Sequence, residues 1–268
     1  MPDPLVSVLI PAYHAAATLT AALRSIATCG LPPEAVEIVV APDDGQDYGN
    51  LLPPTPGLRC LPPGPAASGP GATRNRARAA ARGAWLAFLD ADDKWAPGYL
   101  AALLPLAQAH GASFGRTRIL RGTAPALDLP GTARAEITLE TFGTTGASFH
   151  PVMAAALARP FPDLPAQDVA HAVDLLARLG GSAPLGEATY ELHLRGDSTT
   201  AQEDFSARVA AAYAAYARAF EASDLPPEMA HRAARVFRDK AALNAAYAAE
   251  GQGRAFYDFV ADRLARTG

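Results

Sequence analysis

Short apolar runs alternate with stretches of helical periodicity along the first 120 residues. Residues 6–10 form a β-branched apolar run that Pro11 stops, and residues 18–28 follow with leucine and isoleucine at helical spacing. The alternation continues with apolar runs at 37–41, 58–61 and 85–89 and with helices predicted at 71–83 and 98–110. Strands that alternate with helices predict an α/β fold, a mainly parallel sheet with helices on both faces.

The rest of the chain is less regular at first and then wholly helical. Strands are predicted at 113–120 and 188–194 and a helix at 167–179, whereas residues 121–165 follow no clear period. From residue 201 onward apolar residues recur at helical spacing, and Pro226-Pro227 and the glycines at 251 and 253 separate three helices. We therefore expect an α/β domain over 1–200 and an all-helical extension over 201–268. Its apolar stripes should pack on that domain, or on a second subunit as a homodimer, without touching the chemistry.

Composition indicates a folded protein and excludes several classes. The 268 residues are 50% hydrophobic and 19% charged, and the net charge of −4 gives no overall reason to bind nucleic acid. No apolar stretch is long enough to predict a membrane span or a signal peptide. Cys29 and Cys60 match neither a metal spacing nor a disulfide framework. We expect a cytoplasmic protein, at most peripheral at the inner membrane surface.

Two groups of carboxylates directly follow predicted strands. Asp90, Asp92 and Asp93 come after the apolar run at 85–89, and Asp43-Asp44 come after the run at 37–41. Ligands of parallel sheets bind beyond the carboxyl ends of the strands. Clustered carboxylates repel one another unless a cation is present, and Mg²⁺ and Mn²⁺ take such oxygen ligands and share them with phosphates. The alternative is a solvated turn that caps the next helix.

Arg74 is the one basic residue with a clear chemical context. It lies in the first turn of the predicted helix at 71–83, where the backbone N–H groups favour an anion such as a diphosphate. Arg78 and Arg82 follow on the same face, for which a solvated arginine face is the favoured interpretation. The chain has neither a Gly-Lys-Ser/Thr phosphate loop nor a Gly-x-Ser-x-Gly elbow, and Arg74 replaces the third glycine of a dinucleotide loop.

Four segments together resemble a known family. They are Val-Ser-Val-Leu-Ile-Pro-Ala-Tyr at 6–13, Asp-Asp-Gly-Gln-Asp at 43–47, Gly-Ala-Thr-Arg-Asn at 71–75 and Ala-Phe-Leu-Asp-Ala-Asp-Asp-Lys-Trp-Ala-Pro at 87–97. Their order and spacing resemble family 2 glycosyltransferases of GT-A fold, closely over residues 5–110. The resemblance is thinner at 166–168, where Gln167 replaces the usual Glu, and at 190–198. Residues 201–268 resemble no family that we can name.

The resemblance implies a role for each matching residue. Those on the donor side would bind a nucleotide-diphosphate sugar: Pro11 and Tyr13 bordering the nucleotide pocket, Asp44 or Asp43 on the base, Arg74 beside the nucleotide, Asp90 on the ribose or sugar, and His193 on the diphosphate. Asp92 would hold a divalent metal, Mn²⁺ or Mg²⁺. Asp168 would deprotonate the acceptor hydroxyl. For Asp168 a helix-stabilising carboxylate, and for His193 a structural histidine, are the alternatives.

The implied activity is the non-processive, inverting transfer of one sugar from a UDP-linked donor to a hydroxyl of a glycan, lipid-linked or protein acceptor. Processive synthases of this class usually carry membrane spans and a Gln-x-x-Arg-Trp signature, and the sequence has neither. A nucleotide-sugar binding or scaffold protein that has lost turnover is the first alternative. A nucleotidyltransferase is the second, but residues 14–17 lack the glycine-rich loop that it needs.

Overall fold

The structure is a computed structural model that describes residues 3–131, 134–194, 205–251 and 253–267. Over these residues ten strands form one mixed sheet: β1 (Val6–Ala12), β2 (Val36–Pro42), β3 (Leu58–Cys60), β4 (Trp85–Phe88), β5 (Lys94–Trp95), β6 (Ala112–Arg121), β7 (Ala124–Leu129), β8 (Glu136–Thr138), β9 (Pro151–Ala154) and β10 (Ser182–Leu194). The helices are α1 (Leu19–Ile26), α2 (Pro70–Ala80), α3 (Tyr99–His110), α4 (Leu139–Thr145), α5 (Gln167–Arg178), α6 (Phe205–Glu221), α7 (Pro227–Glu250) and α8 (Phe256–Thr267).

The strands formed by the first 90 residues make a parallel part of the sheet. The strand order is β3-β2-β1-β4-β9-β6-β10-β5, with β7 beside β6 and β8 beside β10. Strands β3, β2, β1 and β4 run parallel to one another, whereas β9 is antiparallel to both β4 and β6. All the strands predicted before residue 90 are confirmed. Strands β1 and β2 are buried on both faces, which is why they read as continuous apolar runs.

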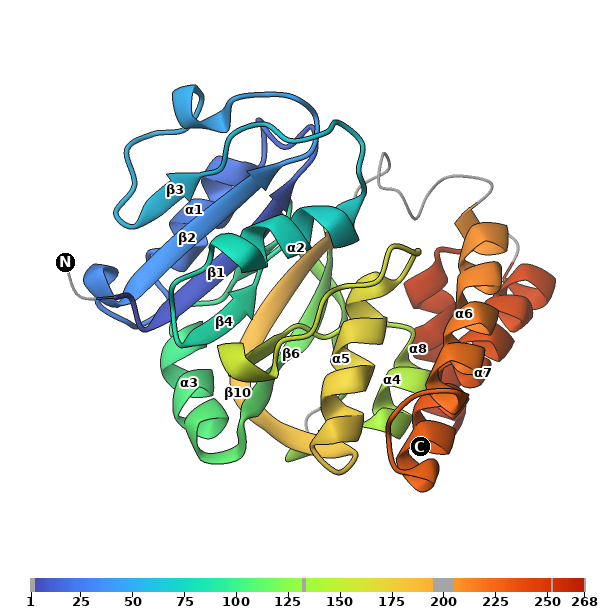
Figure 1. Ribbon diagram of the computed structural model, residues 1–268. Coiled ribbons are helices and arrows are strands. Elements are labelled where there is room, and N and C mark those ends of the chain that lie inside the picture. The colour runs from blue at the N-terminus through green and yellow to red at the C-terminus, as the bar shows by residue number, and fades with distance from the viewer. Residues whose placement is uncertain (1–2, 132–133, 195–204, 252, 268) are drawn as a thin grey trace.

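Each face of the sheet carries its own layer of helices (Figure 1). Alternate residues of β1 point to opposite faces, so that Val8 and Ile10 pack with α1 and α3, while Leu9 packs with α2 and α5. The helices predicted at 18–28, 71–83, 98–110 and 167–179 are all present within a few residues of their expected ends. The sheet with helices on both faces is therefore confirmed.

The region 121–165, which no period described, holds β7, β8, α4 and β9. These elements are short; β7 pairs with the adjacent β6, whereas β8 and β9 pair with distant parts of the chain. Strand β8, for example, is antiparallel to the start of β10. A three- or four-residue strand gives no recognisable alternation, so only the sheet partner reveals it.

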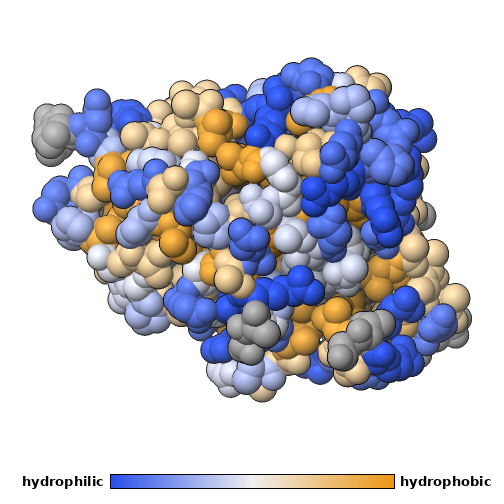
Figure 2. Space-filling view, turned by 90° about the horizontal axis from the view of Figure 1, so that it is seen from below, coloured by the Kyte–Doolittle hydropathy of each residue, from blue (hydrophilic) through white to orange (hydrophobic). Residues whose placement is uncertain are grey.

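The three C-terminal helices pack on the α/β domain, as expected (Figure 1). The apolar stripes of α6 and α7 belong to the same core as Leu9, and Phe220 of α6 stacks on Phe237 of α7 with ring centroids 5.5 Å apart. Phe259 and Val260 of α8 form a small separate cluster with Leu243 of α7. Seen from below, the described residues show hydrophobic patches separated by hydrophilic ones (Figure 2). The proposed boundary between residues 200 and 201 lies outside the described residues, and a homodimer stays a prediction.

None of the helices in the described ranges is long and apolar enough to cross a membrane.

Candidate active site

The sheet order brings the two predicted carboxylate groups to one edge. Strand β1 lies between β2 and β4, and all three run in the same direction. Their carboxyl ends therefore lie side by side, with Tyr13 after β1, Asp43 and Asp44 after β2, and Asp90 after β4. Tyr13 is 56% exposed and packs on His14 with ring centroids 4.2 Å apart. Pro11, within β1, is half-buried.

Asp43 and Asp44 organise the loops at this edge. Asp43 is buried and accepts hydrogen bonds from the backbone N–H groups of Ser68 and Gly69, both 2.9 Å, just before α2 begins. Asp44 accepts hydrogen bonds from the His14 N–H and the Tyr48 hydroxyl, each 2.8 Å. Burial opposes the charged form of Asp44, but these bonds outweigh it and lower its pKa. Asp43 thus holds the loop before α2, and Asp44 holds the loops after β1 and β2. This structural role is compatible with the predicted contact to a nucleotide base.

Helix α2 is held tightly against the chain segment that precedes α5. Asn75 and Phe161 exchange two hydrogen bonds, from the Asn75 side-chain amide to the Phe161 carbonyl (2.9 Å) and from the Phe161 N–H back to Asn75 (2.8 Å). At Gly71 a Cβ atom would meet the carbonyl oxygen of Pro162 at 2.3 Å, so only glycine permits this approach. The 71–75 motif is therefore what brings Arg74 next to α5.

Arg74 lies at the centre of a buried charge cluster. Its side chain is 3% exposed, forms an ion pair with Asp90 and lies over the Phe161 ring at 5.7 Å. Burial disfavours the guanidinium charge, but Asp90 and then Asp168 raise the pKa of Arg74 above its usual value. The buried Nε of Arg74 has no hydrogen-bond partner among the described residues. A cation with an unsatisfied donor at this edge suits an anionic ligand.

The Asp90–Asp93 cluster divides its carboxylates between separate partners. Asp90 is 31% exposed, pairs with Arg74 and lies 3.7 Å from Nε2 of His150. Asp93 is buried and accepts hydrogen bonds from the Tyr190 hydroxyl and the His193 N–H, both 2.8 Å. Burial and the negative charges of Asp90 and Asp92 raise the pKa of Asp93 well above its usual value. Asp93 therefore serves to anchor the cluster on β10.

Asp92, like Asp90, is half-buried. Within the described ranges no group of three His, Cys, Asp or Glu side chains could hold a metal ion. Mn²⁺ and Mg²⁺ bound with a nucleotide need few protein ligands, because diphosphate oxygens and water complete the coordination. The one carboxylate of Asp92 fits that mode, so the residues present are compatible with a metal shared with a ligand.

Asp168 lies in the first turn of α5 and is half-buried. The residue before the helix proper, Ala166, has a φ of +59°, an uncommon conformation for a residue with a side chain. Burial favours the neutral carboxyl of Asp168, but the charge of Arg74, then of His150, and hydrogen bonding from Ser148 outweigh it. The pKa of Asp168 is therefore below its usual value, and the carboxylate is ionised at neutral pH.

His193 contributes mainly its backbone, through the bond to Asp93. Burial and then the charge of Lys94 lower the pKa of its imidazole, and its Nε2 lies 3.8 Å from the Glu191 carboxylate. These contacts are compatible with a structural role for His193 and also with its predicted contact to a diphosphate.

Several residues at this edge escaped the sequence analysis. His150 and Ser148 come from the region without a period, and Tyr190 bridges Asp90 and Asp93 with its hydroxyl, accepting from the Asp90 N–H at 3.1 Å. The charge of Asp168 also raises the pKa of Lys240 on α7, against the larger effect of burial. The C-terminal helices thus come near Asp168, and the expectation that they do not touch the chemistry stays a prediction. No local pattern marks Ser148, His150 or Lys240, whereas Tyr190 begins the 190–198 segment that resembles the family.

The expected solvated arginine face is found only in part, because Arg82 is 59% exposed whereas Arg78 is half-buried. Arg78 donates to the Ala158 carbonyl at 3.3 Å, and Arg82, beyond the end of α2, donates to Glu37 at 2.8 Å. Both side chains find acceptors that are distant in the sequence, which helical spacing cannot reveal.

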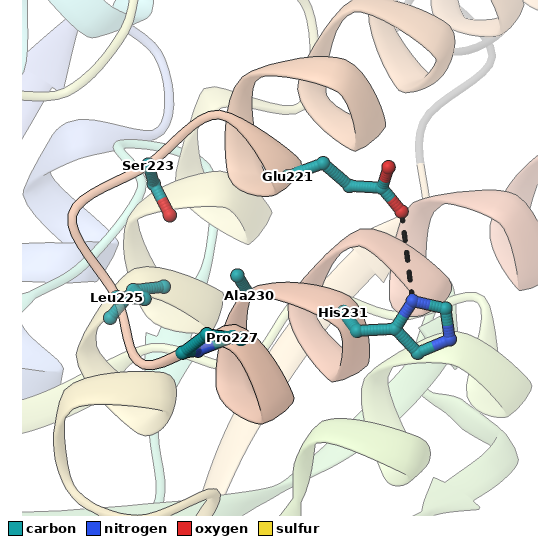
Figure 3. Close-up of a pocket in the computed structure, with 6 residues that line it drawn as sticks. All are labelled: Glu221, Ser223, Leu225, Pro227, Ala230 and His231. Carbon is teal, nitrogen blue, oxygen red and sulfur yellow. Dashed lines mark ion pairs between the residues drawn. The ribbon is translucent and has the colours of Figure 1, made fainter.

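A separate pocket of about 260 Å³ lies at the turn between α6 and α7 (Figure 3). Glu221 and His231 face each other there at 3.7 Å. The neighbouring Asp224 pairs with Arg178 at the far end of α5 from Asp168, about one helix length or ~15 Å away. The pocket is therefore not part of the carboxylate edge.

Comparison with known proteins identifies the class. Residues 7–126 match the family model described as Glycosyl transferase family 2. This part of the chain is therefore similar to the family 2 glycosyltransferases. The succinoglycan biosynthesis protein ExoO of Rhizobium meliloti (strain 1021) is 36% identical over 118 residues, which are 41% of this chain and 31% of that protein. The chain thus matches less than a third of the length of this relative.

Solved structures share the fold. The chain is similar to S. aureus TarS 1–349, with a TM-score of 0.63 and 19% identity over 92% of this chain and 73% of that one. The same protein in complex with UDP-GlcNAc gives a TM-score of 0.65 and 20% identity over 88% and 72% of the two chains. The mannosyltransferase PcManGT from Pyrobaculum calidifontis, in complex with GDP-Man and Mn²⁺, gives 0.54 and 16% over 99% and 80%. The expected GT-A fold is therefore confirmed.

Proposed function

We propose that the protein is a non-processive, inverting glycosyltransferase that moves one sugar from a UDP-linked donor to an acceptor hydroxyl. The observation that carries the proposal is the ionised Asp168 carboxylate beside the Arg74–Asp90 pair, at the carboxyl edge of a domain similar to the family 2 glycosyltransferases. The complex of S. aureus TarS with UDP-GlcNAc supports a nucleotide-sugar donor, although it shares only 20% identity.

The donor side is formed by the ends of β1, β2 and β4. Tyr13 offers an exposed aromatic ring to the base, and the 43–44 carboxylates hold the loops around it. Arg74 stabilises the negative charge of a diphosphate, and its unpartnered Nε is a free donor for it. A divalent metal, Mn²⁺ or Mg²⁺, held by Asp92 would neutralise the charge of the leaving nucleoside diphosphate. PcManGT, whose complex contains Mn²⁺, supports this cofactor.

The acceptor side is formed around Asp168. The acceptor oxygen attacks the anomeric carbon, the bond from that carbon to the diphosphate oxygen breaks, and the electron pair leaves with the nucleotide. The acceptor proton passes to Asp168, whose lowered pKa keeps it in the basic form. One displacement inverts the anomeric centre.

Two measurements test the proposal in order. A thermal-shift panel of nucleotide sugars, with and without Mn²⁺, identifies the donor by the rise in melting temperature. Incubation of that donor with glycan, lipid-linked and peptide acceptors, followed by NMR of the anomeric proton, then reveals transfer and its stereochemistry. A retained anomeric configuration contradicts the mechanism. A melting temperature that rises with UDP and Mn²⁺, without transfer to any acceptor class, favours the alternative of a binding or scaffold protein.

A further inference from the structure

Residues 147–150 carry two side chains of the candidate active site. They lie between α4 and β9, outside any helix or strand, and Ala147 and Phe149 are buried in the core. The alternate residues, Ser148 and His150, act on Asp168 by hydrogen bonding and by charge, respectively. His150 also lies 3.7 Å from the Asp90 carboxylate. The position of residues 147–150 therefore decides the surroundings of both acids.

Helices α7 and α8 pack against the segment that leads into residues 147–150. At Gly146, where φ is +69°, a Cβ atom would meet the Phe256 ring of α8 at 2.9 Å and Leu243 of α7 at 3.2 Å. At Gly143 a Cβ atom would meet Asp239 of α7 at 3.1 Å. The backbone of this segment thus lies directly against α7 and α8, with little room to shift toward them.

Lys240 makes the polar contact in this packing. It lies on α7, is 2% exposed, and its Nζ donates a 3.1 Å hydrogen bond to the carbonyl oxygen of Ala147, next to Ser148. Burial lowers the pKa of Lys240 to about 8, opposed by the charge of Asp168. Burying an ammonium group is costly, and an apolar side chain would fill the same space more favourably. Its presence therefore calls for a role beyond packing.

We propose that Lys240 is a positioning residue for catalysis, which holds the Ala147 carbonyl so that Ser148 and His150 face Asp168 and Asp90. The inference rests on the proposed function for its catalytic consequence, but its structural part stands alone. It makes the C-terminal helices part of the catalytic apparatus, since they set the geometry in which the base works.

The main test replaces Lys240 by methionine, which keeps the volume and removes the donor. In Lys240→Met we expect kcat for transfer to fall at least tenfold, with KM for the donor within twofold of wild type. Lys240→Gln, which keeps an N–H donor, should recover most of the lost kcat. The matched control is Val236→Ala, a buried residue of the same helix whose loss costs stability by packing alone. It should leave kcat within twofold.

A double-mutant cycle separates positioning from general loosening. Because Lys240 acts through Ser148 and His150, adding Lys240→Met to the double variant Ser148→Ala/His150→Ala should lower kcat little further. Effects that multiply, or a Lys240→Met variant with kcat within threefold of wild type, would overturn the proposal.

Hydrogen exchange supplies a readout that does not need turnover. In Lys240→Met the amides of 147–150 should exchange at least tenfold faster, while those of α2 stay unchanged. If wild type transfers no sugar but this exchange pattern is seen, the proposed function fails and the positioning of 147–150 by Lys240 stands. Unchanged exchange at 147–150 overturns the positioning itself, whatever the activity.

Discussion

Two buried clusters of carboxylates and arginines lie on the same sheet and differ in how completely they are satisfied. Glu37, at the start of β2, is 1% exposed and accepts hydrogen bonds on both oxygens from Ser7, Arg59 and Arg82. At the opposite end of the strands, Asp90 is 31% exposed and the buried Nε of Arg74 has no hydrogen-bond partner in the part of the chain that the structure describes. A closed cluster stabilises the fold, whereas an open one retains capacity for a ligand.

The largest effect that we expect is a loss of catalysis when the acid next to the open cluster is changed. Asp168→Asn keeps the size and hydrogen bonding of the side chain but removes its basicity. Transfer should fall on the order of 10²–10⁴-fold, with UDP affinity nearly unchanged. Initial rates and titration calorimetry measure the two quantities. A variant that keeps more than about a tenth of the wild-type rate, a loss of only ~1.4 kcal/mol of transition-state stabilisation, would show that another residue is the base.

The second effect concerns the open cluster and its metal. Asp92→Ala should abolish the part of UDP affinity that depends on Mn²⁺, while the protein still folds. The reason is that a hard carboxylate oxygen is lost from a group of like charges. Calorimetric titration of UDP with Mn²⁺ and with chelator gives the comparison. Equal Mn²⁺-dependent affinity in variant and wild type would exclude Asp92 as the ligand.

The closed cluster should respond in the opposite way. Glu37→Gln should lower the free energy of unfolding by about 2 kcal/mol, because charge-assisted hydrogen bonds to two partly exposed arginines are weakened. Donor KM and kcat per folded molecule should stay at wild-type values. Urea denaturation and steady-state kinetics check the two halves of this prediction. A tenfold change in kcat would mean that the two ends of the sheet are coupled.

The smallest expected effect is the pH dependence of the closed cluster. Burial raises the pKa of Glu37, but Ser7, Arg59 and Arg82 outweigh it, so that its pKa lies below the ordinary 4.5. A lowered pKa means that the stabilisation is complete above the unfolded-state pKa and is lost as pH falls through the folded-state value. The stability difference between wild type and Glu37→Gln should therefore be constant above about pH 5.5 and shrink below pH 4.5. If the stability difference between the two proteins instead grew toward acid pH, the pKa of Glu37 would be raised in the folded state and not lowered.

Local sequence determined the parts of this protein that depend on neighbours in the chain. Strands β1, β2 and β4 could be predicted from continuous apolar runs because both of their faces are largely buried. The carboxylates after β2 and β4 could be assigned to one edge of the sheet because parallel strands end at the same edge. Arg74 was recognisable from its place in the first turn of a helix. The apolar stripes of the C-terminal helices likewise predicted a buried face.

Tertiary structure decided which polar groups meet, because their partners lie far apart in the chain. Tyr190 bonds to the N–H of Asp90 across 100 residues, and Lys240 to the carbonyl of Ala147 across 93. His150 and Ser148 come from elements too short for a period, and their use depends on packing against α7 and α8. A single hydrogen bond between distant residues produces no repeating pattern in the sequence. A buried face does, because its apolar residues recur at regular spacing along the chain.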